Sequence, residues 1–187
     1  MLSLSEADRQ NLLRLARQAV VEAVSRARLP DNIPNDGVFA QRRGVFVTLR
    51  SARRLRGCIG VIDADEPLGE SIVRCAAGAA LQDPRFAPLR PEDLCGLQIE
   101  ISLLEPPAPI DPAEIEIGRH GLLVSQGTHR GLLLPQVAVE HGLTREQFLE
   151  EACRKALLSR EAWRDSETQM LGFTCEVLTD DGVTAFE

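Results

Sequence analysis

Apolar residues recur every three or four positions near the start of the chain. They fall at positions 12, 13, 16, 19, 20, 23, 24 and 27. A period of 3.6 residues is typical of an amphipathic helix, so we expect one over residues 6–27, packed on a sheet. Ser5 and Asp8 resemble a capping box at its start. Proline, glycine and Asx residues within 30–37 predict a loop after it.

Alternating apolar and polar residues predict three strands in the first half of the chain. Segment 44–50 places Val45, Val47 and Leu49 on one face, and a polar link leads to a second strand over 57–62. Segment 97–103 also alternates. In that third strand Glu100 points away from the apolar face.

A second helix is predicted between the second and third strands. Residues 68–81 are rich in alanine and have apolar residues at helical spacing, with Pro67 suited to a first turn. The Asp83-Pro84 pair ends this helix, because the residue before a proline disfavours the helical conformation. Residues 91–94 are typical of one further turn.

Four prolines, at 106, 107, 109 and 112, mark the best candidate boundary in the chain. Beyond them, apolar segments 121–124 and 131–134 predict two buried strands. Thr144 and Gln147 form a capping box for a helix that reaches about Leu158. Alternation over 171–177 predicts a final strand, which we expect to return to the main sheet. Helices mixed irregularly with hairpins favour an α+β fold with mostly antiparallel pairing.

Composition indicates a soluble globular protein of 187 residues. No apolar run approaches the roughly 20 residues that a membrane helix needs. Residues 1–60 carry eleven Lys and Arg against five Asp and Glu, while the whole chain has a net charge of −7. An acidic protein with a local arginine cluster suits a small anionic ligand or a partner patch better than nucleic acid.

Five cysteines form no C-x-x-C pair and leave an odd count. This usage favours reduced thiols, so we expect a cytoplasmic protein. The start of the chain lacks the basic and apolar regions of a secretory signal. Three histidines are spread without ligand spacing, so the sequence predicts neither a metal site nor a cofactor.

The segment Leu55-Arg56-Gly57-Cys58-Ile59-Gly60 places one thiol between two glycines. Glycines let the backbone approach another group closely. If the nearby arginines surround Cys58, they lower its pKa and favour the thiolate. The alternative is a buried strand cysteine beside a solvated, arginine-rich hairpin.

The string LRGCIG resembles the signature of the AMMECR domain family, whose bacterial and archaeal members are called AmmeMemoRadiSam system protein A. The similarity runs from about Leu4 to Val177. Further strings that resemble the family are DPRF at 83–86, EIS at 100–102, EIGRHGL at 116–122 and GLLLPQVA at 131–138.

The resemblance implies a two-lobed α+β fold with a mainly antiparallel sheet, flanking helices and an interlobe cleft. It places about 1–105 and 165–187 in a larger lobe and about 106–164 in a smaller inserted lobe. It also implies two associates, a Memo-like protein and a radical SAM protein.

Two constellations carry the candidate chemistry. In the first, Cys58 is a nucleophile, with His120 and Glu100 as candidate base and orienting group, chosen because the family motifs hold residues of these types there. In the second, Arg56, Arg85 and Arg119 bind an anion, because arginine forks suit phosphate and carboxylate. The backbone N–H groups of Gly57 and Gly60 are candidate donors to the same anion. The alternative is that each arginine pairs with a structural carboxylate such as Asp83 or Glu100.

Other features favour structural roles. The acidic residues Asp63, Asp65, Glu66 and Glu70 suit either a hard metal or, as we favour, a solvated helix start. Trp163 with Phe148 is either a docking surface or, as we favour, core. We expect Cys75, Cys95, Cys153 and Cys175 to pack inside.

The sequence leaves the enzyme question open. In one interpretation Cys58 acts in an arginine-rich interlobe cleft on a small anionic or modified substrate, together with the Memo-like and radical SAM proteins. In the other, the protein is a non-catalytic ligand-binding or scaffold subunit of that system. A nucleic-acid-associated factor is a weaker third possibility.

Overall fold

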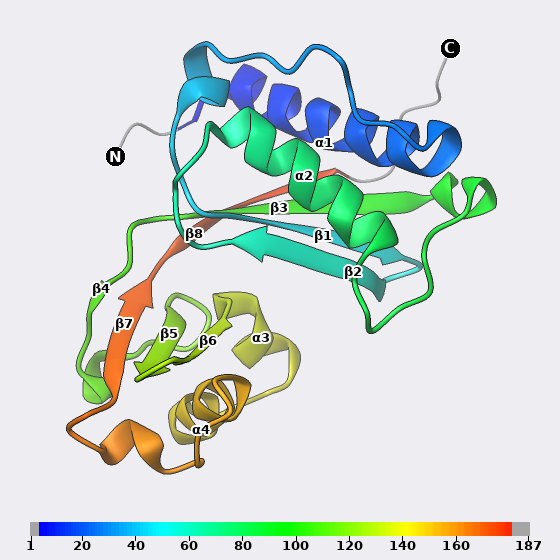
Figure 1. Ribbon diagram of the computed structural model, residues 1–187. Coiled ribbons are helices and arrows are strands. Elements are labelled where there is room, and N and C mark those ends of the chain that lie inside the picture. Colours follow the sequence, from blue (N-terminus) through cyan, green and yellow to red (C-terminus); the bar gives the residue numbers. More distant parts are fainter. Residues whose placement is uncertain (1–3, 181–187) are drawn as a thin grey trace. The chain divides into compact units, whose positions relative to one another are not determined.

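The computed structural model describes residues 4–180, which form two compact units (Figure 1). Of these residues, 4–103 and 177–180 make up the first unit, and 104–176 make up the second. Each unit contains its own four-stranded sheet. Together with the helices, these sheets make an α+β fold, as the sequence predicted.

The first sheet has the strand order β2-β1-β3-β8. Its strands are β1 (Val45–Ser51), β2 (Arg54–Val61), β3 (Leu97–Leu104) and β8 (Cys175–Asp180). β1 pairs antiparallel with both β2 and β3. Pairing on both sides makes β1 the central partner of this part of the sheet.

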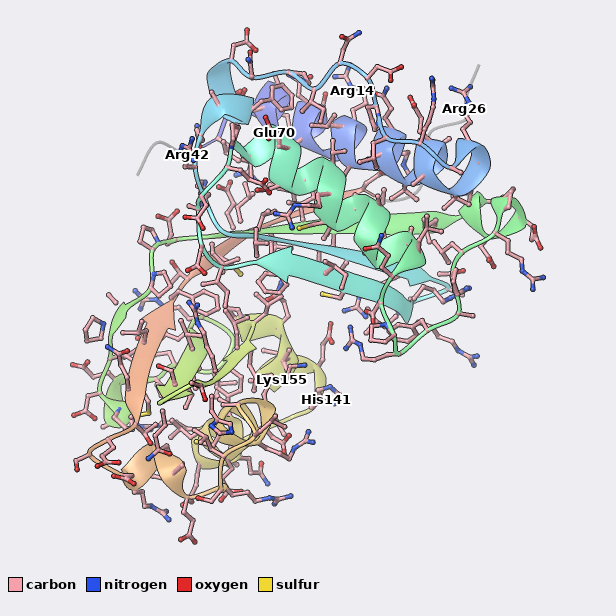
Figure 2. The ribbon with its side chains drawn as sticks, in the orientation of Figure 1. Arg14, Arg26, Arg42, Glu70, His141 and Lys155 are labelled. Atoms are coloured by element: carbon pink, nitrogen blue, oxygen red, sulfur yellow. The ribbon has the colours of Figure 1, made fainter. Side chains whose placement is uncertain are left out.

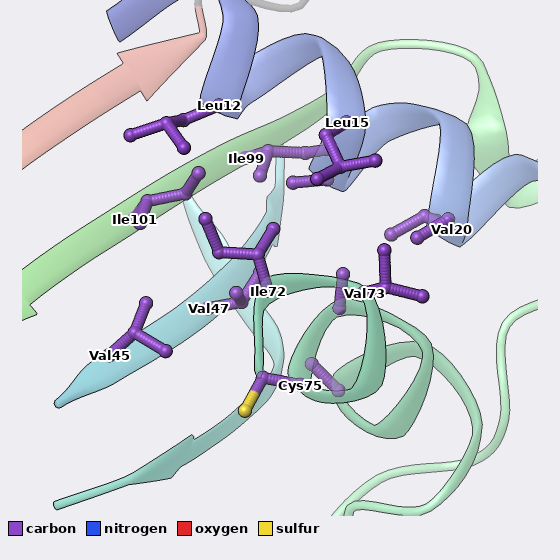
Figure 3. Close-up of a cluster of buried hydrophobic side chains, with 14 of the residues drawn as sticks. Leu12, Leu15, Val20, Val45, Val47, Ile72, Val73, Cys75, Ile99 and Ile101 are labelled. Atoms are coloured by element: carbon purple, nitrogen blue, oxygen red, sulfur yellow. The ribbon is translucent and has the colours of Figure 1, made fainter. Parts of the chain in front are cut away.

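Two helices, α1 (Glu6–Arg26) and α2 (Leu68–Leu81), cover one face of this sheet (Figure 1). The core lies between them and the sheet, where Leu12, Val20 and Ile72 meet strand residues such as Val47 and Ile101 (Figure 3). All five side chains are at most 1% exposed. Burial of each such side chain stabilises the fold by about 1.5–3 kcal/mol.

The predicted capping box starts α1. The Ser5 hydroxyl accepts the Asp8 N–H at 3.1 Å, and the Asp8 carboxylate accepts the Ser5 N–H at 3.3 Å. The helix ends at Arg26, one residue before the predicted end, because Ala27 adopts a left-handed cap with φ of 50°. α2 has the predicted bounds, although Pro67 is its N-cap and not a residue of its first turn.

A tight turn joins β1 to β2. Its two central residues, Ala52 and Arg53, have φ of 47° and 64°, a conformation in which glycine and asparagine are preferred. The pairing register then shifts between Leu49 and Arg50. The sequence predicts Cys58 near the start of a strand over 57–62. The strand instead begins at Arg54, so Cys58 lies in its middle.

The second unit is built on a sheet of order β4-β7-β5-β6. Its elements are β4 (Ala108–Pro109), β5 (Gly121–Gln126), β6 (His129–Leu133), α3 (Pro135–Glu140), α4 (Arg145–Lys155) and β7 (Gln169–Phe173). Thr144 and Gln147 cap α4 as predicted. Phe148, Leu149 and Ala152 of α4 form a core with Leu122 and Val124 of β5.

The prediction of one final strand over 171–177 is wrong. β7 pairs antiparallel with β5 in the second sheet, whereas β8 belongs to the first sheet. Residues 165–173 therefore belong with the second unit and not with the larger lobe, where the resemblance had placed them.

Shorter elements complete the chain. α3 was not predicted, and α4 ends at Lys155, short of the predicted Leu158. In the part of the chain that the structure describes, the 3-10 turns are Gly37–Ala40, Pro91–Leu94, Pro112–Glu114 and Ala162–Arg164. Within residues 4–180, no helix combines the length and apolar character needed to cross a membrane.

Candidate functional site

Cys58 lies in a row of side chains that crosses three strands. Thr48 of β1 pairs with Cys58 on one side and with Glu100 of β3 on the other. Because Val47 and Leu49 face the helices, strand alternation places this row on the opposite face of the sheet. The Thr48 hydroxyl lies 3.2 Å from Cys58 Sγ, to which it donates.

A buried carboxylate holds the backbone of Cys58. Asp83 follows α2, and its Oδ2 accepts the Cys58 N–H at 2.9 Å. Arg85 binds the same carboxylate in a fork, with Nε 2.9 Å from Oδ1 and Nη2 2.6 Å from Oδ2. The Asp83 side chain is 2% exposed, so its charge requires these partners.

The pKa of Asp83 reflects this arrangement. The fork from Arg85 and the N–H groups of Cys58 and Arg85 lower it from the ordinary 3.8 to about 2, although burial acts in the opposite direction. Asp83 is therefore ionised at neutral pH. Its negative charge neutralises the arginine charge that lies closest to the thiol.

The pKa of the Cys58 thiol is raised, opposite to the arginine-based expectation. Burial is the largest cause, and the charges of Asp83 and Glu100 also raise it. The Thr48 hydroxyl and the charge of Arg85 lower it, but they do not outweigh the burial. A thiol with a raised pKa stays protonated at neutral pH and is a weak nucleophile.

The two glycines beside Cys58 are required by packing. A Cβ on Gly57 would lie 1.9 Å from the Ala79 carbonyl oxygen, so Gly57 lets α2 approach β2 closely. A Cβ on Gly60 would lie 2.2 Å from the Phe46 ring. These contacts account for the glycine spacing without a bound anion.

Each of the three candidate anion-binding arginines has a carboxylate partner. Arg56 Nη1 lies 3.4 Å from Asp93 Oδ1, and Arg85 pairs with Asp83. Arg119 Nη1 lies 2.9 Å from Glu116 Oε1 in the second unit. All three arginines therefore pair with carboxylates, which was the alternative to an anion site. Their partners are Asp93, Asp83 and Glu116, and Glu100 is not one of them.

His120 lies in the second unit, whereas Cys58 and Glu100 lie in the first. Its Nδ1 accepts the Glu116 N–H at 3.1 Å, which leaves Nε2 to carry the proton of the neutral ring. The role of His120 as a base for Cys58 stays a prediction. So does the role of Glu100, whose strand lies two strand spacings, about 10 Å, from that of Cys58.

The remaining candidates have structural surroundings. Glu66 accepts hydrogen bonds from Ser71 and Arg74 at the start of α2. Within residues 4–180, no group of three or more His, Cys, Asp or Glu could hold a metal ion. Trp163 packs against the second core, as we favoured, with Arg164 above its ring.

The cysteines other than Cys58 divide into three kinds. Cys75 and Cys153 are buried, as expected, and Cys175 is half-buried. Cys95 is exposed, so the expectation that it packs inside is wrong. It follows the short 3-10 turn Pro91–Leu94 and precedes Gly96, at the edge of the packed region.

Two residues of the site were missed from the sequence. Strand alternation placed Thr48 on the face opposite to Val47, but the pairing of Thr48 with Cys58 depends on the register shift after Leu49, which the sequence does not reveal. Asp83 lies in the DPRF string, where the sequence predicts a partner for arginine but not the bond to the Cys58 backbone.

The AMMECR1 family model matches residues 13–178. The chain belongs to the AMMECR1 family. It is 42% identical to a protein from Methanothermobacter thermautotrophicus, over 96% of this chain and 97% of that relative. A protein from Thermococcus kodakarensis is 41% identical, over 91% of this chain and 89% of the relative.

A solved AMMECR1-type structure supports the same assignment. The crystal structure of an uncharacterised protein from Pyrococcus horikoshii superimposes with a TM-score of 0.84 at 38% identity. The match covers 91% of this chain and 90% of that one. The AMMECR1 fold therefore extends over nearly all of both chains.

Proposed function

We propose that this AMMECR1-family protein is a non-catalytic binding subunit that works with a Memo-like protein and a radical SAM protein. The observation that carries the proposal is that the charged groups next to Cys58, Asp83 and Arg85, are already paired with each other. Asp83 holds the Cys58 N–H and both arms of the Arg85 fork. A nucleophilic cysteine instead requires a stabilised thiolate.

The binding surface proposed for this function is the edge of β2 where Cys58 is partly exposed beside Arg85, while Thr48 behind it is buried. Arg85 borders Cys58 and keeps half of its side chain exposed. Its Nη1 has no hydrogen-bond acceptor within residues 4–180, so one edge of the guanidinium can receive a carboxylate or phosphate of a ligand or partner. Cys58 then contributes shape and backbone rigidity, not bond-making chemistry.

The test is direct binding between purified proteins. The Memo-like and radical SAM proteins of the same organism are titrated with this protein in a calorimeter, and the wild type is compared with Cys58→Ser. We expect a saturable complex with at least one of them and an affinity within about twofold for the variant. Cys95→Ser, at an exposed thiol, is the matched control.

Two results would contradict the proposal. One is the absence of a complex with both proteins. The other is a complex that Cys58→Ser abolishes while Cys95→Ser leaves it intact, since a thiol used only for packing tolerates a hydroxyl of similar size.

The enzymatic alternative has one observation in its favour. Cys58 is partly exposed, and the charge of Arg85 lowers its pKa in part. In that case Cys58 would act on a small anionic or modified substrate. Thiol reactivity separates the two functions, because only the enzymatic one needs Cys58 to ionise readily.

A further inference from the structure

A hollow lies in the first unit, between α1 and the segment that follows it. Its volume is about 740 Å³, within the roughly 300–1,000 Å³ typical of small-molecule sites. One wall is α1 from Asn11 to Arg26, and the other includes Asn32, Pro34 and Phe39. We call it the α1 groove.

The floor of the α1 groove is apolar. Leu15 and Val21 of α1 and Pro34 and Phe39 of the following segment supply the apolar part of its lining. Lining residues from 11 to 26 follow the helix for about 22 Å, at a rise of 1.5 Å per residue. The groove is therefore long enough for an extended apolar chain.

The charges along the groove leave a positive excess. Arg14 and Arg26 both extend from α1 (Figure 2). Arg26 makes no ion pair within residues 4–180, and Arg14 donates to the neutral Asn11 side chain at 2.8 Å.

The other charged lining residues are compensated. Glu22 accepts from Gln18 and lies 3.1 Å from Arg28 Nε. Arg17 is turned towards Asp180 and the Leu97 carbonyl oxygen. The positive charge of the groove that has no carboxylate partner within residues 4–180 therefore comes from Arg14 and Arg26.

We propose that the α1 groove binds an amphipathic organic anion, with its apolar body on Leu15, Val21, Pro34 and Phe39 and its carboxylate or phosphate at Arg26. Arg26 is the anion contact because its guanidinium is unpaired within residues 4–180. The proposal is independent of the proposed function, since the groove is formed by α1 and not by the Cys58 row.

The probes are decanoate and decyl phosphate, which share the apolar body and differ in the anion. Binding is measured by calorimetry, and the site is located by chemical-shift changes at Val21 and Phe39. We expect saturable binding of at least one probe. Arg26→Gln should weaken it about five- to tenfold, because a charge-assisted contact is lost. The probe that binds more tightly distinguishes the two anion classes.

Two further variants make the test specific. Val21→Glu places a negative charge on the apolar floor and should weaken binding at least as much as Arg26→Gln. Arg54→Gln removes an exposed arginine on β2 and should leave binding unchanged. The proposal is overturned if neither probe binds below about 1 mM, if Arg26→Gln and Arg54→Gln behave alike, or if shifts occur away from the groove.

Discussion

Asp83 is the residue on which the surroundings of Cys58 depend most. It is buried, it carries a full charge at neutral pH, and its carboxylate joins the end of α2 to the middle of β2. A neutral amide at this position keeps the shape but loses the charge-assisted fork to Arg85. Stability should therefore depend on pH through this one side chain.

We predict that Asp83→Asn destabilises the fold by about 2 kcal/mol at pH 7, the value of a pKa shift from 3.8 to about 2. A lowered pKa means that the ionised form stabilises the fold above about pH 4. That contribution is lost as the pH falls from 4 to 2. Urea unfolding of both proteins from pH 7 to pH 2 should show the difference shrinking over this window.

Asp36→Asn is the control for this measurement, because Asp36 is exposed and makes no capping bond. Its unfolding free energy should follow the wild type at every pH. A deficit of Asp83→Asn that stays constant down to pH 2 would show that the ionised carboxylate is not what stabilises the site.

Sequence reasoning located Cys58 on a strand beside a hairpin but not the groups that contact it. The register shift between Leu49 and Arg50 moves the partner of Cys58, so counting back from the turn does not reach Thr48. The contact with Asp83 joins residues 25 positions apart. Periodicity describes faces of single elements and carries no information on such a contact.

Among the elements, the packing of α2 on β2 depends on a glycine in the strand. The Cβ of alanine at Gly57 would lie 1.9 Å from the Ala79 carbonyl oxygen, a backbone atom that cannot rotate away. We predict that Gly57→Ala destabilises the fold by about 3 kcal/mol or more, since α2 and β2 must separate. Urea unfolding measures the change.

Gly78→Ala is the matched comparison at the same interface. A Cβ on Gly78 would lie 3.5 Å from the nearest Ile59 carbon, an ordinary contact, and Gly78 is inside α2. Alanine should therefore stabilise the helix by about 0.5–1 kcal/mol. Equal effects of the two substitutions would show that the close approach at Gly57 does not govern this packing.

The elements themselves differ in how far the sequence predicts them. α1 and α2 are long enough to show a clear period, and capping residues fix the starts of α1 and α4. α3 has six residues, too few for a period to appear. Alternation continues from β7 into β8, although the chain changes sheet at Thr174, because alternation does not specify which sheet a strand joins.

For the whole molecule, the fold and the family are far better determined than the chemistry. Two separate hydrophobic cores, one in each unit, account for the apolar pattern along most of residues 4–180. The same fold recurs at 38% identity in the Pyrococcus horikoshii protein. The proposed binding function and the enzymatic alternative differ in the state they require of one thiol, Cys58.

The measurement that tests this account most directly is the rate of iodoacetamide alkylation at each of the five cysteines against pH, read by mass spectrometry. Cys95 is the exposed internal reference. Because burial raises the pKa of Cys58, we predict that it reacts more slowly than Cys95 and responds to pH only above the ordinary thiol value of about 8.5. Alkylation of Cys58 ahead of the other four, with an apparent pKa below 8.5 and protection by phosphate, would contradict the account and favour the enzyme.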